Sequence, residues 1–402
     1  MSIAASIAAS IASITEPTLL GLLIGLPALA VATRLARVRA GRAVALLQDA
    51  TPLVLVLAWV GLLISLLQGA WLAAAIAAVL AVYHLWLVYR LVRRRTTPGW
   101  VADAPTTTLA LANVYIDNDE TDESARQLVA VNADIVVIVE TTPTFRAAFD
   151  RVGGAERYPH RTFDADDDSD YAVSMYCSVE PHEMGMIDIG ELRVASAKVP
   201  VGGAVLHVVG AIPTAAVDPG GYATWKREMA ALTEFAGSRQ SPLVIAGDLN
   251  TTIHRAVYRD LAEAGLDDAH DDLGLGLRPS FKLAATGFLA RLGPLVRLDH
   301  ALTNRWVWAT EVHDLDSAGS DHRPFVATLA VRSPRGSRAS TAAQPVRAEQ
   351  SQPFVQTTTA DAQRVLPASD AGETSPISTT RHRSTRYPMS QQPICLPGPD
   401  IR

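Results

Sequence analysis

The sequence has little cysteine. Its 402 residues contain two, Cys177 and Cys395, which lie in different regions of the chain. So low a count predicts neither a disulfide framework nor a cysteine-ligated metal cluster, and it leaves the redox compartment open.

Basic residues are scarce in the middle of the chain. Between Val101 and Val331 there are 18 lysines and arginines against 34 aspartates and glutamates, whereas both flanking regions are net positive. Tight binding to nucleic acid requires a broad basic face, which this composition does not supply. Action on a polyanion stays open only through a local basic patch or a bound metal ion.

Charge is also missing from a long N-terminal stretch. From Ala50 to Tyr89 there is no Asp, Glu, Lys or Arg. A helix needs about 20 residues to cross a bilayer, so the stretch predicts two spans, near 51–68 and 70–90. An earlier apolar run predicts a further span near 18–33. The alternative is a buried soluble hairpin, but soluble helices normally carry a polar face. We therefore expect a multi-pass protein of the cell membrane, in contact with membrane lipid.

Arginine clusters at 34–42 and 90–95 bear on the orientation of these spans. With three spans both clusters fall on one side of the membrane, and the positive-inside rule makes that side the cytoplasm. The arginines thus favour a cytoplasmic location for the rest of the chain. If the short first span does not insert, the topology inverts.

The region after residue 106 changes to short apolar runs separated by amphipathic segments. Mixed strands and helices of this kind predict an α/β sandwich over 107–331. The expected strands are 108–116, 134–140, 204–212, 242–247, 297–303 and 325–331, and the expected helices are 123–132, 225–235 and 253–264.

Two further segments complete the organisation. Residues 96–106 are expected to be a linker between the membrane region, 1–95, and the sandwich. Residues 332–402 are rich in Ser, Thr, Gln and Pro and lack periodicity. This composition predicts a disordered tail, because it is too polar to form a core.

Polar side chains stand where the expected strands end or break. Any one of them is explained as a cap, a turn residue or an edge polar group, but that explanation has to be repeated at five strand ends. Neighbouring strand ends converge on one mouth of a sandwich, where ligands commonly bind. The residues are Asn113, Glu140, Asp248, Asn250, Asp299, His300, Asp321 and His322.

The residue types at this mouth indicate a hard cation and a phosphate. Oxygen ligands such as Glu140 and the side-chain carbonyl of Asn113 suit Mg²⁺, which takes one or two carboxylates plus water and substrate phosphate. Asp248 is placed to orient or deprotonate an attacking water. Asn250 is placed to hold that water or a phosphate oxygen.

A histidine and a second carboxylate complete the set. A carboxylate fixes the tautomer of a histidine and stabilises its imidazolium form. Asp299 with His322 therefore forms a credible dyad facing the phosphate. Together the residues predict metal-assisted hydrolysis of a phosphate ester.

The ordered motifs ANVYIDN, VIVE, AGDLN, RLDHAL and GSDHRPF resemble the endonuclease/exonuclease/phosphatase superfamily over about Thr108 to Val331. The resemblance implies a DNase I-like, four-layer α/β sandwich that hydrolyses phosphodiesters or phosphomonoesters with Mg²⁺ or Mn²⁺. Three hydrophobic spans ahead of such a domain resemble a membrane-bound bacterial branch of the superfamily. The resemblance to that branch suggests that the sandwich lies outside the cytoplasm, whereas the distribution of arginines favours a cytoplasmic location.

The resemblance also implies a role for each motif residue. The residues at the metal would be Asn113, Glu140 and Asp321. The catalytic residues would be Asp248, Asn250, Asp299 and His322, of which Asn250 and His322 also contact the substrate.

Two positions depart from the family pattern. Many members carry a histidine that contacts the scissile phosphate in a turn after the middle strand, but here Ile212 or a neighbour stands there. His207 lies upstream in the same strand, in the wrong register to replace it. Members also usually have Gln before the metal glutamate, where this chain has Val139. The missing histidine puts leaving-group protonation and phosphate stabilisation in question.

The expected substrate is a phosphate ester, either a lipid head group, a nucleotide or a nucleic acid, and no protein partner is expected. The rival interpretation is a weakened or inactive sandwich that serves as a membrane-tethered binding module. A transporter is disfavoured because the spans contain no carboxylate to mark a pathway.

Overall fold

The structure, a computed structural model, describes residues 16–164, 172–216, 218–282 and 293–334. From residue 335 onward, the tail predicted to be disordered lies outside the described residues.

Apolar helices form the N-terminal region. They are α2 (Glu16–Leu35), α3 (Arg42–Asp49), α4 (Thr51–Leu67) and α5 (Trp71–Val92). Helices α2 and α5 are each long and apolar enough to cross a membrane, whereas α4 qualifies only together with α3, from which it is bent by 67°. The described residues therefore supply two candidate spans, or three if the bent pair is one span.

The long helices pack on one another through small and branched side chains. Ile24 of α2, Leu55 and Ala58 of α4 and Ala77 of α5 belong to one buried cluster. Large apolar side chains cover the outside of the bundle; Leu63, for example, is 58% exposed. A helix that is apolar all round fits a membrane better than water.

The first sheet has six strands in the order β11-β12-β1-β2-β4-β3. Strands β1 and β2 are parallel and are joined by helix α6, whereas β12 runs antiparallel to β1. The strands are β1 (Thr106–Asn113), β2 (Ile135–Val139), β3 (His160–Phe163), β4 (Val173–Cys177), β11 (Val307–Asp314) and β12 (Phe325–Val331).

The second sheet also has six strands, in the order β5-β6-β7-β8-β10-β9. Strands β7 and β8 are parallel across helix α9, and β10 runs antiparallel to β8. The strands are β5 (Glu183–Ile189), β6 (Leu192–Val201), β7 (Ala204–Gly210), β8 (Leu243–Asp248), β9 (Leu266–Asp268) and β10 (Asp299–Asn304).

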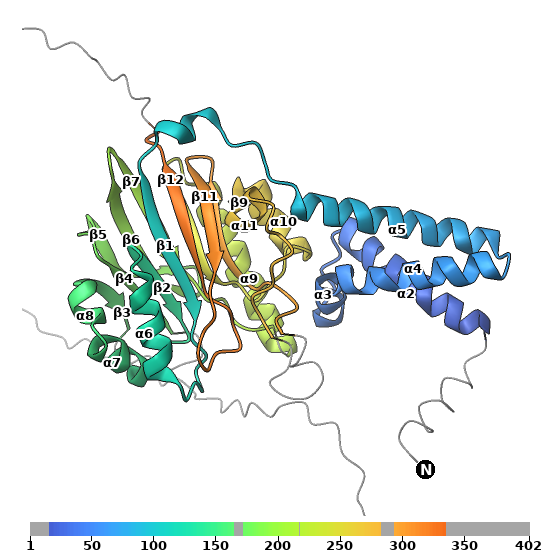
Figure 1. The fold of residues 1–402 in the computed structure, drawn as a ribbon, viewed down its shortest axis with the longest axis horizontal. Helices are drawn as coiled ribbons and strands as arrows, with labels where there is room; N and C mark the ends of the chain where they lie inside the picture. Colours follow the sequence, from blue (N-terminus) through green and yellow to red (C-terminus); the bar gives the residue numbers. More distant parts are fainter. Residues whose placement is uncertain (1–15, 165–171, 217, 283–292, 335–402) are drawn as a thin grey trace, which may run out of the picture. The chain divides into compact units, whose positions relative to one another are not determined.

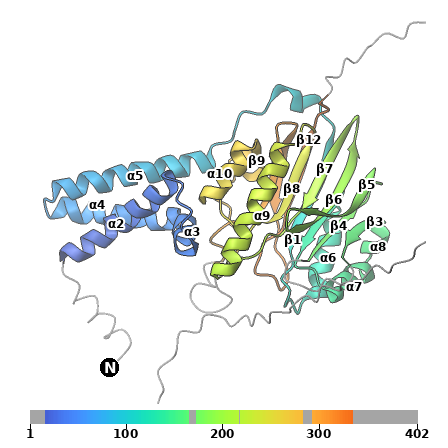
Figure 2. The same cartoon turned by 180° about the vertical axis from the view of Figure 1, so that it is seen from behind.

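Helices cover the outer faces of both sheets, which gives the four layers expected from the sequence (Figure 1). Helices α6 (Thr121–Val131), α7 (Pro143–Arg151) and α8 (Gly154–Arg157) lie against the first sheet, and α9 (Pro219–Gly237) and α10 (Ala256–Glu263) lie over the second (Figure 2). The short α11 (Ala269–Asp272) follows β9.

Strand alternation explains how three apolar cores form. In β1, Leu109 and Leu111 point into the core between the sheets, while Ala110 and Ala112 face the helical layer with Phe149. On the other side, Trp225 of α9 packs on the outer face of the second sheet. Successive side chains in a strand point to opposite faces, so each central strand contributes to two cores.

Strand register brings the polar ends together at one edge of the sandwich. Asn113 at the end of β1 pairs with Val139, directly before Glu140. In the other sheet Asp299 lies opposite Asp248. Because β12 begins beside the end of β1, the residues preceding it reach the same edge.

Several elements differ from the sequence-based expectation. Strands β3 to β6, β9 and β11 were not expected as separate strands. The segment predicted to be a linker contains a 3-10 helix, η1 (Gly99–Asp103), whose Val101 is buried against Trp308. Strands β5 and β11 carry exposed or half-exposed polar residues between apolar ones, so a search for apolar runs does not find them.

Candidate active site

Asn113, Glu140 and Asp248 form one hydrogen-bonded cluster at the mouth of the sandwich. Asn113 Nδ2 donates to Glu140 Oε1 at 2.7 Å and to Asp248 Oδ2 at 3.1 Å. The Asn113 oxygen accepts from the backbone N–H of Tyr115 at 3.0 Å, and a backbone N–H can only donate, so the amide orientation is fixed. The side-chain oxygen expected to face a metal is therefore turned to the backbone, and Asn113 holds the two carboxylates through its nitrogen.

His322 and Asp299 form a buried pair next to this cluster. His322 Nδ1 lies 2.7 Å from Asp299 Oδ2, and its Nε2 lies 3.6 Å from Asp248 Oδ2. Ser320 Oγ accepts from the His322 backbone N–H and donates to the carbonyl of Asn113. The histidine is thus fixed both through its ring and through its backbone.

The structure brings all of the site residues expected from the sequence, except His300, to this one mouth. Asp321 Oδ1 lies 4.0 Å from His322 Nε2, and the backbone N–H of Asn250 donates to Asp248 Oδ1 at 2.9 Å. Asn250 Nδ2 donates to the carbonyl of Pro213.

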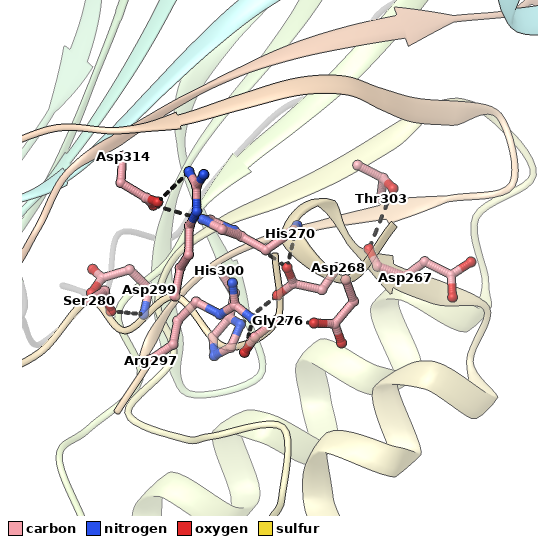
Figure 3. A network of polar contacts seen from close by, with 12 residues as sticks. Asp267, Asp268, His270, Gly276, Ser280, Arg297, Asp299, His300, Thr303 and Asp314 are labelled. Carbon is pink, nitrogen blue, oxygen red and sulfur yellow. Dashed lines mark hydrogen bonds and ion pairs between the residues drawn. The ribbon is translucent and has the colours of Figure 1, made fainter. Parts of the chain in front are cut away.

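His300 faces away from the mouth because it follows Asp299 in a strand. Its Nδ1 lies 2.6 Å from Asp268 Oδ2 (Figure 3), and its Nε2 lies 2.9 Å from the carbonyl of Thr251. Burial alone would raise the pKa of Asp268, but Arg297 and hydrogen bonds from His270 and His300 hold it well below its usual range.

The mouth accumulates negative charge. Burial, with the nearby charge of Asp248, raises the pKa of Glu140 to about 7 even though Asn113 donates to it. Burial also raises the pKa of Asp248 and of Asp321. Buried carboxylates that repel one another in this way are stabilised by a cation.

A divalent metal fits these residues. Glu140, Asp248 and His322 each offer a ligand atom, and these atoms lie within 4.8 Å of one another. Asp299 Oδ1 and Asp321 Oδ1 are buried without a hydrogen-bond partner in the part of the chain that the structure describes. Oxygen-rich donor sets of this kind suit a hard cation such as Mg²⁺ or Mn²⁺.

His322 stays protonated over a wide pH range. Burial would lower its pKa, but the carboxylates of Asp299 and Asp248 outweigh burial and raise the pKa to about 10. The site therefore presents one imidazolium among several carboxylates, with its Nε2 toward Asp248.

Three residues at the mouth have a left-handed backbone. The φ angles are 61° at Tyr115, 58° at Glu140 and 50° at Asn250. This region is uncommon for residues other than glycine, and such strain clusters at functional sites. At Glu140 the turn lets Ile116 N–H donate to Oε2 at 3.1 Å.

A basic residue near the mouth was not identified from the sequence. Lys282 Nζ donates to the carbonyl of Ser320 at 3.1 Å, and its backbone N–H donates to the carbonyl of Asp321. The loop after residue 278 has no strand pattern, so sequence spacing gave no signal for Lys282. Ser280, which accepts from the Asp299 backbone N–H, was missed for the same reason.

The structure shows the surroundings of Ile212 and Val139, the two positions that depart from the family pattern. Ile212 is 1% exposed and belongs to the core between the sheets, so it does not present a polar group to the mouth. His207 bonds to Ser196 Oγ at 2.9 Å and packs against Phe235, and so it does not replace the missing histidine. Val139 is buried in the inner core.

Comparison with known proteins gives one family match. The model of the Endonuclease/Exonuclease/phosphatase family matches residues 110–322, just over half of the chain. Among curated proteins, none matches the chain significantly.

Solved structures with a similar fold include three from different organisms. A humanized TDP2 of D. rerio is 16% identical with a TM-score of 0.47, covering 56% of this chain and 98% of that chain. Sphingomyelinase C from Streptomyces griseocarneus is 20% identical with a TM-score of 0.42, covering 56% and 99%. An endonuclease/exonuclease/phosphatase from Beutenbergia cavernae is 14% identical with a TM-score of 0.44, covering 56% and 72%.

Proposed function

The chain belongs to the Endonuclease/Exonuclease/phosphatase family, and from this premise we propose that it is a membrane-anchored, metal-dependent hydrolase of phosphate esters. One observation carries the proposal: the carboxylates of Glu140 and Asp248 and the imidazole of His322 bring polar atoms within 4.8 Å of one another, and His322 also lies 2.7 Å from Asp299. If these polar residues were only helix caps and turn residues, there would be no reason for residues from both sheets to meet at this mouth of the sandwich.

The metal would be held by carboxylates on the Glu140 side of the mouth, with Asp321 near it. When bound, Mg²⁺ or Mn²⁺ supplies Lewis-acid stabilisation of the phosphate charge. Asn113 keeps the Glu140 and Asp248 carboxylates in place by donating to both.

The remaining residues act on water and on phosphate. Asp248 accepts a proton from the attacking water, whose oxygen forms the new bond to phosphorus as the ester P–O bond breaks, and the leaving oxygen takes a proton from solvent water. The imidazolium of His322, kept protonated by Asp299, donates to a non-bridging phosphate oxygen. Asn250 orients the water or a phosphate oxygen through its side-chain amide.

The substrate is proposed to be a phosphodiester or phosphomonoester in a lipid head group, a nucleotide or a nucleic acid. The acidic composition of residues 101–331 disfavours long nucleic acid as the substrate. The hydrophobic N-terminal helices would place the chain at a membrane, which favours a lipid head group or a small diester. No protein partner is needed for this chemistry.

Membrane anchoring is proposed from the helices. Arginines after α2 and α5 contact the sandwich: Arg37 bonds to Glu263, Arg39 to Asp260 and Arg95 to Asp272. Both arginine clusters and the sandwich therefore belong on one side of the bilayer, as three spans require. The positive-inside rule makes that side the cytoplasm. Retention of the full chain in membranes washed with carbonate at high pH tests the anchoring separately from catalysis.

The test of catalysis is hydrolysis of bis-p-nitrophenyl phosphate by the full chain in detergent with Mg²⁺ or Mn²⁺. Glu140→Gln and Asp248→Asn, like a chelator, should abolish turnover. Glu183→Gln and Asp188→Asn make the same chemical changes in exposed ion pairs and should leave it intact. If the folded, metal-loaded chain hydrolyses neither diesters nor monoesters, the result would favour the alternative of a non-catalytic binding module. The lack of a histidine near Ile212 is the observation that supports this alternative.

A further inference from the structure

A second pocket, separate from the candidate active site, lies where the N-terminal helices meet the sandwich. Its volume is about 230 Å³. Pro52 and Leu53 from the start of α4 and Leu91 from the end of α5 form one wall, and His254 and Arg297 line it from the sandwich. None of the residues assigned to the candidate active site lines this pocket.

Arg297 is buried in this pocket with part of its hydrogen-bonding capacity unused. Its side chain is 5% exposed, and Nη2 donates to Asp271 Oδ1 and to the carbonyl of Gly276, both at 3.2 Å. Nε and Nη1 have no partner among the described residues. Figure 3 shows Arg297 beside Gly276. Buried guanidinium nitrogens without acceptors are unfavourable, so the position suits an anionic acceptor.

His254 adds a second unused polar atom. The residue is 7% exposed, and its Nδ1 has no partner in the described part of the chain. Burial, together with the charges of Arg34 and Arg297, lowers its pKa to about 3, so the ring is neutral and donates one N–H at neutral pH.

The acidic side chains around the pocket are already neutralised. Asp49 accepts from Arg255 Nε at 2.7 Å, and Asp271 accepts from Arg297. Arg278, which also lines the pocket, is bonded to Asp314. Arg34 is buried nearby and its described partner is the neutral hydroxyl of Tyr83. Asp268 is a further ionised carboxylate close to Arg297, so the surroundings hold charges of both signs. The feature that favours an anion is therefore the pair of guanidinium nitrogens of Arg297, Nε and Nη1, that have no acceptor among the described residues.

The apolar wall indicates that the anion carries hydrocarbon. Leu53 is 48% exposed and begins a row of exposed apolar side chains on α4, spaced three or four residues apart, that continues with Val56, Val60 and Leu63. Side chains with this spacing lie on one face of a helix. A ligand with its charge at Arg297 can thus extend an acyl chain from the pocket along α4.

We propose that this pocket binds the phosphate of an anionic phospholipid, with Arg297 and His254 as donors and with the acyl chains against α4. The proposal rests on the membrane anchoring proposed above and is independent of catalysis. A lipid bound there would contact both the N-terminal helices and the sandwich, next to the ion pair of Asp49 and Arg255.

The experiment uses the full chain carrying Glu140→Gln, in EDTA, so that hydrolysis at the active site plays no part. Nanodiscs of phosphatidylcholine with increasing phosphatidylglycerol provide the probe, and native mass spectrometry after gentle release counts bound lipid. We expect one phosphatidylglycerol per chain, with preference over phosphatidylcholine. Arg297→Gln should weaken retention by about tenfold or more, since a charge-assisted hydrogen bond contributes about 1.5–3 kcal/mol.

A paired variant keeps the test valid if Arg297→Gln does not fold. Leu53→Trp fills the mouth of the pocket without removing a charge, and Leu67→Trp makes the same change at the opposite end of α4, where Leu67 is 78% exposed. Retention should fall with Leu53→Trp and persist with Leu67→Trp. Equal retention in both, equal binding of the two lipids, or full displacement by glycerol 3-phosphate would each overturn the proposal. A metal-loaded wild-type chain that binds phosphatidylglycerol but hydrolyses neither diesters nor monoesters would overturn the proposed catalysis alone.

Discussion

Asp49 and Arg255 form a buried ion pair between the N-terminal helical region and the loop after β8. Arg255 Nε donates to Asp49 Oδ2 at 2.7 Å, and the two side chains are 13% and 8% exposed for Asp49 and Arg255. Arg255 Nη1 also donates to the carbonyl of Asn250 at 2.8 Å, and its guanidinium lies 4.8 Å from the ring of Trp225. Asp49 therefore holds, through Arg255, the backbone of a proposed catalytic residue.

Replacing Asp49 by alanine should destabilise the chain strongly. The change leaves the Arg255 charge buried without its partner, and breaking a buried pair in this way costs about 3–5 kcal/mol. Thermal unfolding in detergent measures the effect, and turnover should fall with it because Asn250 loses its support. Arg37→Ala breaks an exposed, solvent-screened pair with Glu263 and should change the unfolding temperature little. Equal unfolding temperatures for the two variants would contradict this reading of Asp49.

Lys282 is expected to take over part of the role of the missing histidine. It is a basic side chain bonded to the carbonyl of Ser320, two residues before His322, on the phosphate side of the proposed site. Lys282→Met should lower kcat/KM by about tenfold, because a hydrogen bond to a charged group contributes about 1.5–3 kcal/mol. Lys282→Arg should restore part of the loss. Lys226→Met, on α9 over the ring of Tyr222, provides the matched control, and an equal effect of both methionines would refute the assignment.

Sequence reasoning located the candidate site because the polar residues stood at the ends of strongly apolar strands. Asn113, Glu140, Asp248 and Asp299 are separated by up to 186 positions in the sequence, yet strand pairing within each sheet and the packing of the two sheets place them at one edge. The α/β sandwich followed from the same pattern of strands and helices, and its four layers followed from the family resemblance; both are confirmed. Alternation within a strand also explains why His300, next to Asp299, faces the other way.

The features of the site that could not be predicted from the sequence depend on tertiary contacts. Lys282 and Ser280 sit in an irregular segment, and only folding brings them to His322 and Asp299. The turn of the Asn113 amide toward Tyr115 N–H depends on a backbone conformation that spacing does not encode. Likewise, nothing in the local sequence of Asp49 points to Arg255, 206 residues away.

The stability of the chain should fall in mild acid, in part because of His207. Burial, followed by the charges of Arg239 and Lys198, lowers its pKa to about 4. In the unfolded chain a histidine has a pKa of about 6.5. Between these values the unfolded state binds the proton more tightly, so stability is full above about pH 6.5 and falls as the pH drops toward 4.

His207→Gln should remove this component, which amounts to at most about 3 kcal/mol. Glutamine can still bond to Ser196 but does not titrate. Between pH 7.5 and 4 the unfolding temperature of the wild type should therefore fall more steeply than that of the variant. His313→Gln, at an exposed position beside Glu311, controls for loss of a histidine as such. A wild-type curve and a His207→Gln curve that run parallel over the whole range would show that His207 does not contribute.

Binding of Mg²⁺ or Mn²⁺ should stabilise the chain whether or not it turns over a substrate. The buried carboxylates of Glu140 and Asp248 repel one another, and a cation that binds the folded state alone stabilises it by about 2.7 kcal/mol at 100 times its dissociation constant. The unfolding temperature of the full chain should rise with added metal and return with a chelator. Glu140→Gln should abolish the metal-dependent rise, whereas Glu183→Gln, which removes an exposed carboxylate paired with Lys198, should keep it. If metal stabilised the Glu140→Gln chain as much as the wild type, the cation would be binding elsewhere, and the proposed hydrolase would lose its metal site.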